Sequence, residues 1–333
     1  MEKIRLGVVG TGLIWEYTHM PIINSMKDTY EVTALCVSKP EKREKWQNLY
    51  PLARIYLDYN ELVRDENVDV VLVATPISLN HVVTIAALNA GKDVFEEKPI
   101  ATNVCDANAV LAAEKANDKR VIMLEQLLYD PKLNYIQDLI KTKKLGKPVM
   151  FEMLTHFVLD PKDDPTVGYS KTKWRMNPDF PLGAIFDGGA HDFAVISTLF
   201  GIPKSLYSVG SELRPDMGKY DHILTSFAFE GSACGFHSHS AYLGGSNNYF
   251  NIRFSNGAVY SDDAGLYVEP RGEEKNLVPF EAIDLYANMW KSIAKVYSGE
   301  CAPVFTAEQA AQSVRIFDAI VKSLDEDTSV SLT

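Results

Sequence analysis

Two short apolar runs in the first quarter of the chain constrain its fold most strongly. Ile4–Val9 and Val68–Ala74 are each of strand length, with a single charged residue in each. Such runs are typical of parallel strands that are buried on both faces. Thr75-Pro76 ends the second run, a helix is predicted over Leu79–Ala90, and Asp93–Glu97 follows as another strand. A strand, a helix and a strand at this spacing form a right-handed β-α-β unit, so the sequence predicts a parallel sheet.

A glycine turn follows the first of these strands. Gly10 can adopt a tight turn, and Gly12 lets the backbone approach a pyrophosphate that the start of the next helix would stabilise. The third glycine of the usual dinucleotide fingerprint is replaced by Trp15. An ordinary turn is the alternative interpretation. The position of the turn after a buried strand, and before a predicted helix, favours the dinucleotide site.

The end of the second predicted strand, Glu31–Val37, bears on the choice of cofactor. NAD-binding folds place an acidic residue here to accept hydrogen bonds from the ribose hydroxyls, and this chain has none. Ser38 can donate to a 2′-phosphate and Lys39 can neutralise it. The sequence therefore favours NADP(H), with NAD(H) as the second candidate. The alternative is a solvated turn without any preference.

The charged stretch Glu97-Lys98-Pro99 ends the strand that begins at Asp93. Ligands of open parallel sheets bind just outside the carboxyl ends of the strands. Lys98 is therefore a candidate cation that faces a bound ligand, and a solvated charged turn is the alternative.

The second half of the chain predicts a different sheet. Alternating strands are expected over Val149–Phe157, Ser205–Val209, Ile223–Phe229, Ala233–Ala241, Tyr249–Phe254 and Ala258–Asp262. Asp187 and His191 precede a helix predicted over Asp192–Phe200. If that helix begins early enough, the two side chains share one face, where a carboxylate can orient an imidazole. Taken alone, the pair is better explained by a helix-start Asp and a buried structural His.

His237 and His239 are two residues apart on a predicted strand, so both imidazoles face one side. This arrangement could be half of a metal site. Because no third ligand is evident in the sequence, we predict a polar sheet face or a subunit contact there, and no metal.

Four segments together carry a resemblance to a known family: Gly10-x-Gly12, Ala74-Thr75-Pro76, Ala90–Val94 and Glu97–Ala101. They resemble the glucose–fructose oxidoreductase/inositol dehydrogenase (GFO/IDH/MocA) family of NAD(P)-dependent oxidoreductases. The resemblance implies a Rossmann dinucleotide-binding domain over residues 1–125. It also implies an α/β domain over residues 126–333 with a large open, mostly antiparallel sheet, which family members use to form homodimers or homotetramers. A cis Lys98–Pro99 peptide bond is also implied.

The resemblance assigns roles to individual residues. The implied catalytic residues are Lys98, Asp187 and His191. The implied cofactor-binding residues are Gly10, Gly12, Leu13, Ile14, Ser38, Lys39, Thr75, Pro76, Asn80, Glu97 and Lys98. Trp174, Arg175 and His191 are the candidates for contact with substrate. Asn80 stands where the family often has a histidine, and this difference concerns the fine positioning of the cofactor.

The implied activity is hydride transfer between the nicotinamide and a hydroxyl or carbonyl group of a sugar, polyol or related small molecule. The active site is expected in the cleft between the two domains. Two other functions of the same fold stay open, namely a non-catalytic NADP(H)-sensing regulator and an NAD-dependent glycoside-cleaving enzyme.

Composition excludes several partners. The 333-residue chain carries a net charge of −11, which argues against binding to nucleic acid or to anionic membranes. Four widely scattered cysteines without a Cys-x-x-Cys motif, and no signal peptide, indicate a reduced, cytoplasmic protein.

Overall fold

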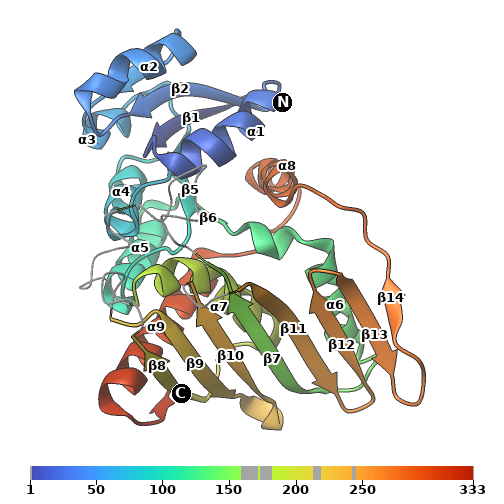
Figure 1. The fold of residues 1–333 in the computed structure, drawn as a ribbon. Helices are drawn as coiled ribbons and strands as arrows, with labels where there is room; N and C mark the ends of the chain where they lie inside the picture. Colours follow the sequence, from blue (N-terminus) through green and yellow to red (C-terminus); the bar gives the residue numbers. More distant parts are fainter. Residues whose placement is uncertain (1, 159–171, 173–181, 213–218, 242–244, 333) are drawn as a thin grey trace. The chain divides into compact units, whose positions relative to one another are not determined.

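The computed structural model describes residues 2–158, 172, 182–212, 219–241 and 245–332, and the chain is drawn in Figure 1. Two compact units divide it. Unit 1 comprises Met1–Gln126 and Asp284–Val314, and unit 2 comprises Leu127–Ile283 and Arg315–Thr333. The segment Asp284–Val314 therefore belongs with the N-terminal unit, whereas the sequence boundaries place it in the second domain.

Unit 1 is built on a six-stranded sheet in the order β3-β2-β1-β4-β5-β6. Its strands are β1 (Ile4–Val9), β2 (Tyr30–Cys36), β3 (Arg54–Tyr56), β4 (Val70–Val73), β5 (Asp93–Glu97) and β6 (Val121–Leu124). Every neighbouring pair is parallel. The chain order reverses between β1 and β4, and this switch point is where open α/β sheets bind ligands. The predicted parallel Rossmann sheet is confirmed.

The helical elements assigned to unit 1 are η1 (Trp15–His19, a π-helical turn), α1 (Met20–Ser25), η2 (Pro40–Lys42), α2 (Arg43–Leu49), α3 (Tyr59–Leu62), α4 (Ile77–Asn89), α5 (Val104–Asn117) and α8 (Leu285–Tyr297). Asn103 caps α5, since its side chain accepts from the Asp106 amide. Gly91 follows α4 with φ +78°, the left-handed geometry expected of a residue just past a helix end.

Helix α8 belongs to unit 1 because a buried tryptophan anchors it there. The Trp290 side chain is fully buried, and its ring contacts Tyr30 and Phe95 edge-on at centroid distances of 5.3 and 5.8 Å. The Tyr30 hydroxyl donates to the Trp290 carbonyl oxygen at 2.7 Å. Tyr30 and Trp290 are 260 positions apart, and nothing local in the sequence indicates that they meet. For this reason the predicted domain boundaries did not assign α8 to the N-terminal unit.

Unit 2 contains a nine-stranded sheet in the order β14-β13-β12-β11-β7-β10-β9-β8-β15. Its strands are β7 (Pro148–His156), β8 (Ser205–Ser211), β9 (His222–Ala228), β10 (Cys234–Ser240), β11 (Asn247–Phe254), β12 (Gly257–Asp262), β13 (Gly265–Pro270), β14 (Asn276–Val278) and β15 (Val330–Ser331). All neighbouring pairs are antiparallel except β7 and β10. The predicted, mostly antiparallel sheet is confirmed, and β13, β14 and β15 extend it beyond the strands that the sequence indicated.

The remaining helical elements among the described residues are η3 (Gln126–Tyr129), α6 (Pro131–Thr142), α7 (Ala184–Phe200), η6 (Glu230–Ser232) and α9 (Ala307–Glu326), which runs from unit 1 into unit 2. In unit 2, Phe317 of α9 packs against Phe186 and Phe193 of α7, with ring centroids 4.3 and 4.8 Å apart. Phe193 also contacts Phe227 on the sheet at 6.3 Å. These rings form an aromatic core between α7, α9 and the sheet. Among the described helices, none has both the length and the apolar character of a membrane span.

Candidate active site

The glycine turn after β1 has the geometry of a phosphate-binding loop. Gly10 has φ +101°, and a Cβ there would lie 2.2 Å from the Ala74 carbonyl oxygen, so only glycine lets the turn pack against the end of β4. Gly12 is exposed, and a Cβ added to it would meet nothing within 4 Å. The Glu16 amide donates to the Gly12 carbonyl at 2.9 Å, which starts the following helix. The turn therefore leaves open space at a helix N-terminus, as a pyrophosphate requires.

Leu13 and Ile14 follow this turn and are half-buried. Trp15, which replaces the third glycine, is fully buried in η1, and its ring lies 6.4 Å from that of Tyr50. A π-helical turn is uncommon and often lies at a functional site. At the end of β2, Ser38 and Lys39 are both exposed, and Lys39 forms no ion pair with any described residue.

Asn80 holds together the loops at the carboxyl ends of β4 and β5. Its side-chain oxygen accepts from the Thr75 hydroxyl at 2.7 Å, and the turn Thr75-Pro76 leads into α4. Its amide nitrogen donates to the carbonyl oxygens of Glu97 and Pro99 at 3.1 and 3.0 Å. Asn80 is fully buried. It therefore positions the residues on either side of Lys98, and this role accounts for an amide at a place where the family often has a histidine.

A second buried network reaches Lys98 through Glu97, and sequence reasoning missed it. The Trp290 indole N–H donates to His19 Nδ1 at 3.1 Å. Because Nδ1 accepts, the neutral ring carries its proton on Nε2, which donates to Glu97 Oε1 at 2.7 Å. The other carboxylate oxygen of Glu97 accepts from the Lys98 backbone amide at 3.2 Å. His19 and Trp290 are fully buried and Glu97 is 6% exposed, so the network is shielded from water.

Lys98 itself is half-buried and directly follows β5, next to the switch point of the sheet. The Lys98–Pro99 peptide bond is cis, as predicted. The predicted residues at this end of the sheet, namely Gly10, Gly12, Thr75, Asn80, Glu97 and Lys98, all follow or support the carboxyl ends of β1, β4 and β5.

In unit 2, helix α7 begins at Ala184, eight residues before the predicted start at Asp192. Gly188 and Gly189 hid this start, since glycine disfavours helix interiors. Asp187 and His191 are therefore one turn apart within a helix, and both are half-buried. Trp174 and Arg175, the predicted substrate contacts, lie outside the described residues.

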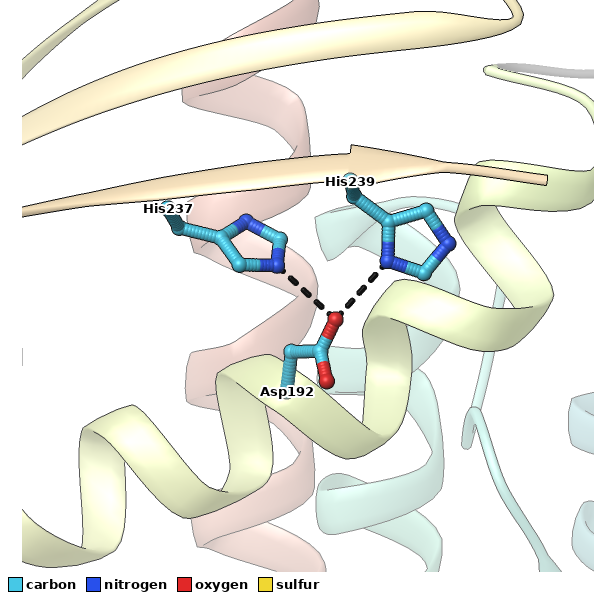
Figure 2. Close-up of side chains that lie close together, drawn as sticks. All are labelled: Asp192, His237 and His239. Atoms are coloured by element: carbon cyan, nitrogen blue, oxygen red, sulfur yellow. Dashed lines mark hydrogen bonds and ion pairs between the residues drawn. The ribbon is translucent and has the colours of Figure 1, made fainter. Parts of the chain in front are cut away.

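Next to His191, Asp192 is buried between two histidines of β10 (Figure 2). Its Oδ2 lies 2.8 Å from His237 Nε2 and 2.8 Å from His239 Nδ1. Burial acts to raise the pKa of Asp192, but the hydrogen bonds and charges of the two histidines outweigh it and hold this pKa below its ordinary value. Burial lowers the pKa of His239 despite the nearby carboxylate. Asp192 thus joins His237 and His239 as a third polar group, which could not be identified from the sequence.

Comparison with protein families agrees with this architecture. Residues 4–125 match the model of the oxidoreductase family with an NAD-binding Rossmann fold, and residues 133–260 match the GFO/IDH/MocA C-terminal domain. The chain therefore belongs to the GFO/IDH/MocA family, as the sequence motifs predicted.

Individual relatives are distant. An uncharacterized oxidoreductase of Schizosaccharomyces pombe is 27% identical over 208 residues, which are 62% of this chain and 54% of that protein. The chain spans 54% to 64% of the length of the relatives that it matches in this yeast and in Saccharomyces cerevisiae. The scyllo-inositol 2-dehydrogenase (NADP(+)) of Bacillus subtilis is 23% identical over 361 aligned positions, covering 100% of this chain and 97% of that one. An oxidoreductase from Thermotoga maritima of known crystal structure is 25% identical in sequence and superposes with a TM-score of 0.86. The match covers 99% of this chain and 98% of the Thermotoga maritima chain.

Proposed function

We propose that this protein is an NAD(P)-dependent dehydrogenase or reductase that acts on a CH–OH group of a sugar, polyol or related small molecule. The observation that carries the proposal is the position of Lys98. Its cation follows β5, next to the switch point of a dinucleotide-binding sheet, and two buried networks fix the backbone on both sides of it. That much buried polar structure around one lysine fits a reacting group better than a solvated turn.

The three predicted catalytic residues have complementary roles. The cofactor supplies the redox chemistry, and the protein supplies position, a proton acceptor and charge stabilisation. His191 exchanges the proton with the substrate hydroxyl or carbonyl oxygen, and Asp187, one turn earlier on α7, orients the His191 ring. Lys98 donates to the same oxygen and stabilises the negative charge that develops there.

The geometry of the glycine turn supports a dinucleotide as cofactor, and the end of β2 supports NADP(H) over NAD(H). Ser38 and Lys39 are exposed there, so a hydroxyl and an ammonium group are available to a 2′-phosphate. The Bacillus subtilis relative is an NADP(+) enzyme by name. Tighter binding of NAD(H) than of NADP(H) would contradict this preference.

A panel of sugars and polyols, followed by nicotinamide absorbance with NAD and NADP side by side, tests the proposal. We expect turnover of at least one substrate and a lower Kd for NADP. The matched variant Lys39→Glu should reverse the cofactor preference without removing turnover, because it changes only the charge offered to the ribose.

Two other functions predict different results in the same panel. A non-catalytic NADP(H)-sensing regulator would bind the dinucleotide and turn over nothing. An NAD-dependent glycoside-cleaving enzyme would release a leaving group without net reduction of the cofactor. The Asp187/His191 pair on one helical turn, together with Lys98, favours the dehydrogenase over the regulator.

The family resemblance also supports a homodimer or homotetramer. The unit 2 sheet presents Tyr207, Val209 and Leu224 at its surface, with exposures of 37%, 45% and 39%. These three residues alternate on the neighbouring strands β8 and β9, with Val209 paired to Leu224. A second copy of the chain would cover them. A cytoplasmic location agrees with the four cysteines, which are all free thiols.

A further inference from the structure

The cluster of Asp192, His237 and His239 in unit 2 has the composition of a metal site. His237 and His239 alternate along β10 and face α7, from which Asp192 projects between them (Figure 2). All three residues are buried, with exposures of 3%, 0% and 0%. One carboxylate and two imidazoles from two packed elements are a donor set that zinc and related divalent transition metals bind.

The donor atoms converge closely enough to share one ion. One oxygen and one nitrogen from each ring lie within 4.8 Å of one another, and the two contacts to Asp192 Oδ2 are each 2.8 Å. Zinc binds nitrogen and oxygen at about 2.0–2.2 Å, so tetrahedral ligands are roughly 3.3–3.6 Å apart. To admit the ion, each of these two contacts would open by about 0.5–0.8 Å, and the two ring nitrogens, now within 4.8 Å of each other, would take the same spacing.

The surroundings of Asp192 are also those of a metal ligand. Its other oxygen, Oδ1, accepts a hydrogen bond from the Thr155 hydroxyl at 3.1 Å, which fixes the carboxylate and leaves Oδ2 to face the rings. Carboxylates that bind metals are commonly held by such an outer hydrogen bond. The ion-pair partners of Asp192 among the described residues are these two histidines, without a lysine or arginine. A divalent cation between the three groups would stabilise this buried carboxylate further.

A second histidine pair, on the strands β7 and β9 that flank β10, provides an internal contrast. His156 and His222 meet on the Ser238 hydroxyl, at 2.8 and 3.1 Å from Nε2 of each ring. Ser238 lies between His237 and His239 on β10, so this pair is on the opposite face of the sheet. Its shared partner is a hydroxyl and not a carboxylate, so this pair lacks the third strong ligand that Asp192 offers to the other pair.

We propose that Asp192, His237 and His239 bind one divalent transition-metal ion, with zinc as the best match, and that this ion fastens helix α7 to strand β10. Three protein ligands leave one position of a tetrahedral shell for water. Mg²⁺ is a poor match, because it prefers oxygen ligands. The close approach of α7 to the ring of His239 depends on Gly188, where a Cβ would lie 3.0 Å from that ring. This site revises the sequence prediction of no metal, and it does not depend on hydride transfer.

Metal content and cobalt absorption test the proposal on the 333-residue chain. The chain, expressed with added Zn²⁺ and desalted, should retain about one zinc per chain. The stripped protein should bind Co²⁺ with the visible absorption of a tetrahedral or five-coordinate site. At 100 times Kd, Zn²⁺ should raise the melting temperature by about 5 °C, and Mg²⁺ should not.

Variants separate this site from adventitious binding. Asp192→Asn and His239→Gln keep polar side chains and should each weaken Zn²⁺ binding by at least about 100-fold, whereas Thr155→Val should weaken it about 10-fold. The matched control is the double variant His156→Gln/His222→Gln. It removes two imidazoles, as many as the proposed site contains, and should bind zinc like the wild type. Folded wild-type protein that shows no saturable Co²⁺ absorption overturns the proposal, even if a variant fails to fold. The proposal is also overturned if Asp192→Asn still binds zinc as the wild type does, or if the control variant no longer binds it.

Discussion

Replacing His19 with alanine should reveal how strongly the buried network behind Lys98 holds unit 1 together. The change removes the acceptor of the Trp290 indole N–H and the donor to Glu97 Oε1, contacts of 3.1 and 2.7 Å. Each buried group left unpaired costs about 1–3 kcal/mol, and a carboxylate costs more than an indole. The expected loss in the free energy of unfolding is therefore about 3–5 kcal/mol.

Urea denaturation followed by tryptophan fluorescence measures this loss. Trp15, Trp46 and Trp290, three of the four tryptophans, lie in unit 1, so the signal reports mainly on that unit. His19→Gln is the conservative variant, because an amide can accept from the indole and donate to the carboxylate, and it should recover about half of the loss. Turnover should fall together with stability, since Glu97 Oε2 holds the Lys98 amide.

The matched control is His81→Ala on α4, where the imidazole lies 3.5 Å from a half-exposed partner, Asp106. Such partly exposed pairs contribute about 0–1 kcal/mol. If His19→Ala and His81→Ala cost the same, or if His19→Ala keeps full stability, the reasoning about the buried network is refuted.

Three further predictions concern unit 1. Burial raises the pKa of Glu96 well above its ordinary value of 4.5. The contribution of Glu96 to stability is therefore complete below pH 4.5. As the pH rises, this contribution declines by about 1.4 kcal/mol per pH unit until the folded-state pKa is reached. Glu96→Gln should remove this decline in urea titrations at pH 5 and 8, and an unchanged slope would contradict the assignment. Gly10→Ala should lower both stability and dinucleotide affinity, whereas Gly12→Ala should weaken only dinucleotide binding. Thermal melting measures the stability and calorimetry the affinity. Equal melting temperatures for the two variants would show that the Gly10 turn does not need to pack closely against Ala74. Burial raises the pKa of the Cys36 thiol to about 11, so native alkylation followed by mass spectrometry should spare Cys36 and label the exposed thiols Cys105, Cys234 and Cys301.

The elements of unit 1 were predictable where local sequence signals determine them. The predicted bounds of β1 and β5 match, because apolar runs and turn residues mark these boundaries. The start of α7 was missed because two glycines interrupt its first turns. Strand β14 was missed because it is short and mostly exposed, so it carries no apolar pattern.

The residues that surround the site were less predictable than the site itself. Lys98, Asp187 and His191 follow from motifs, but His19 and Trp290 are 271 positions apart and meet only in the folded unit. In the same way, β10 shows two histidines in sequence, and only the packing of α7 adds Asp192. Long-range pairs of this kind carry no local signal, so a single sequence cannot reveal them.

Lys98 is proposed to take part in hydride transfer and not only to bind the cofactor. The most direct measurement is single-turnover reduction of NADP by Lys98→Ala, with the best substrate of the panel, alongside the Kd for NADP by fluorescence titration. We expect the rate to fall by about 10²- to 10⁴-fold and the Kd to change by less than about threefold. A rate close to that of the wild type, with the cofactor bound, would contradict it.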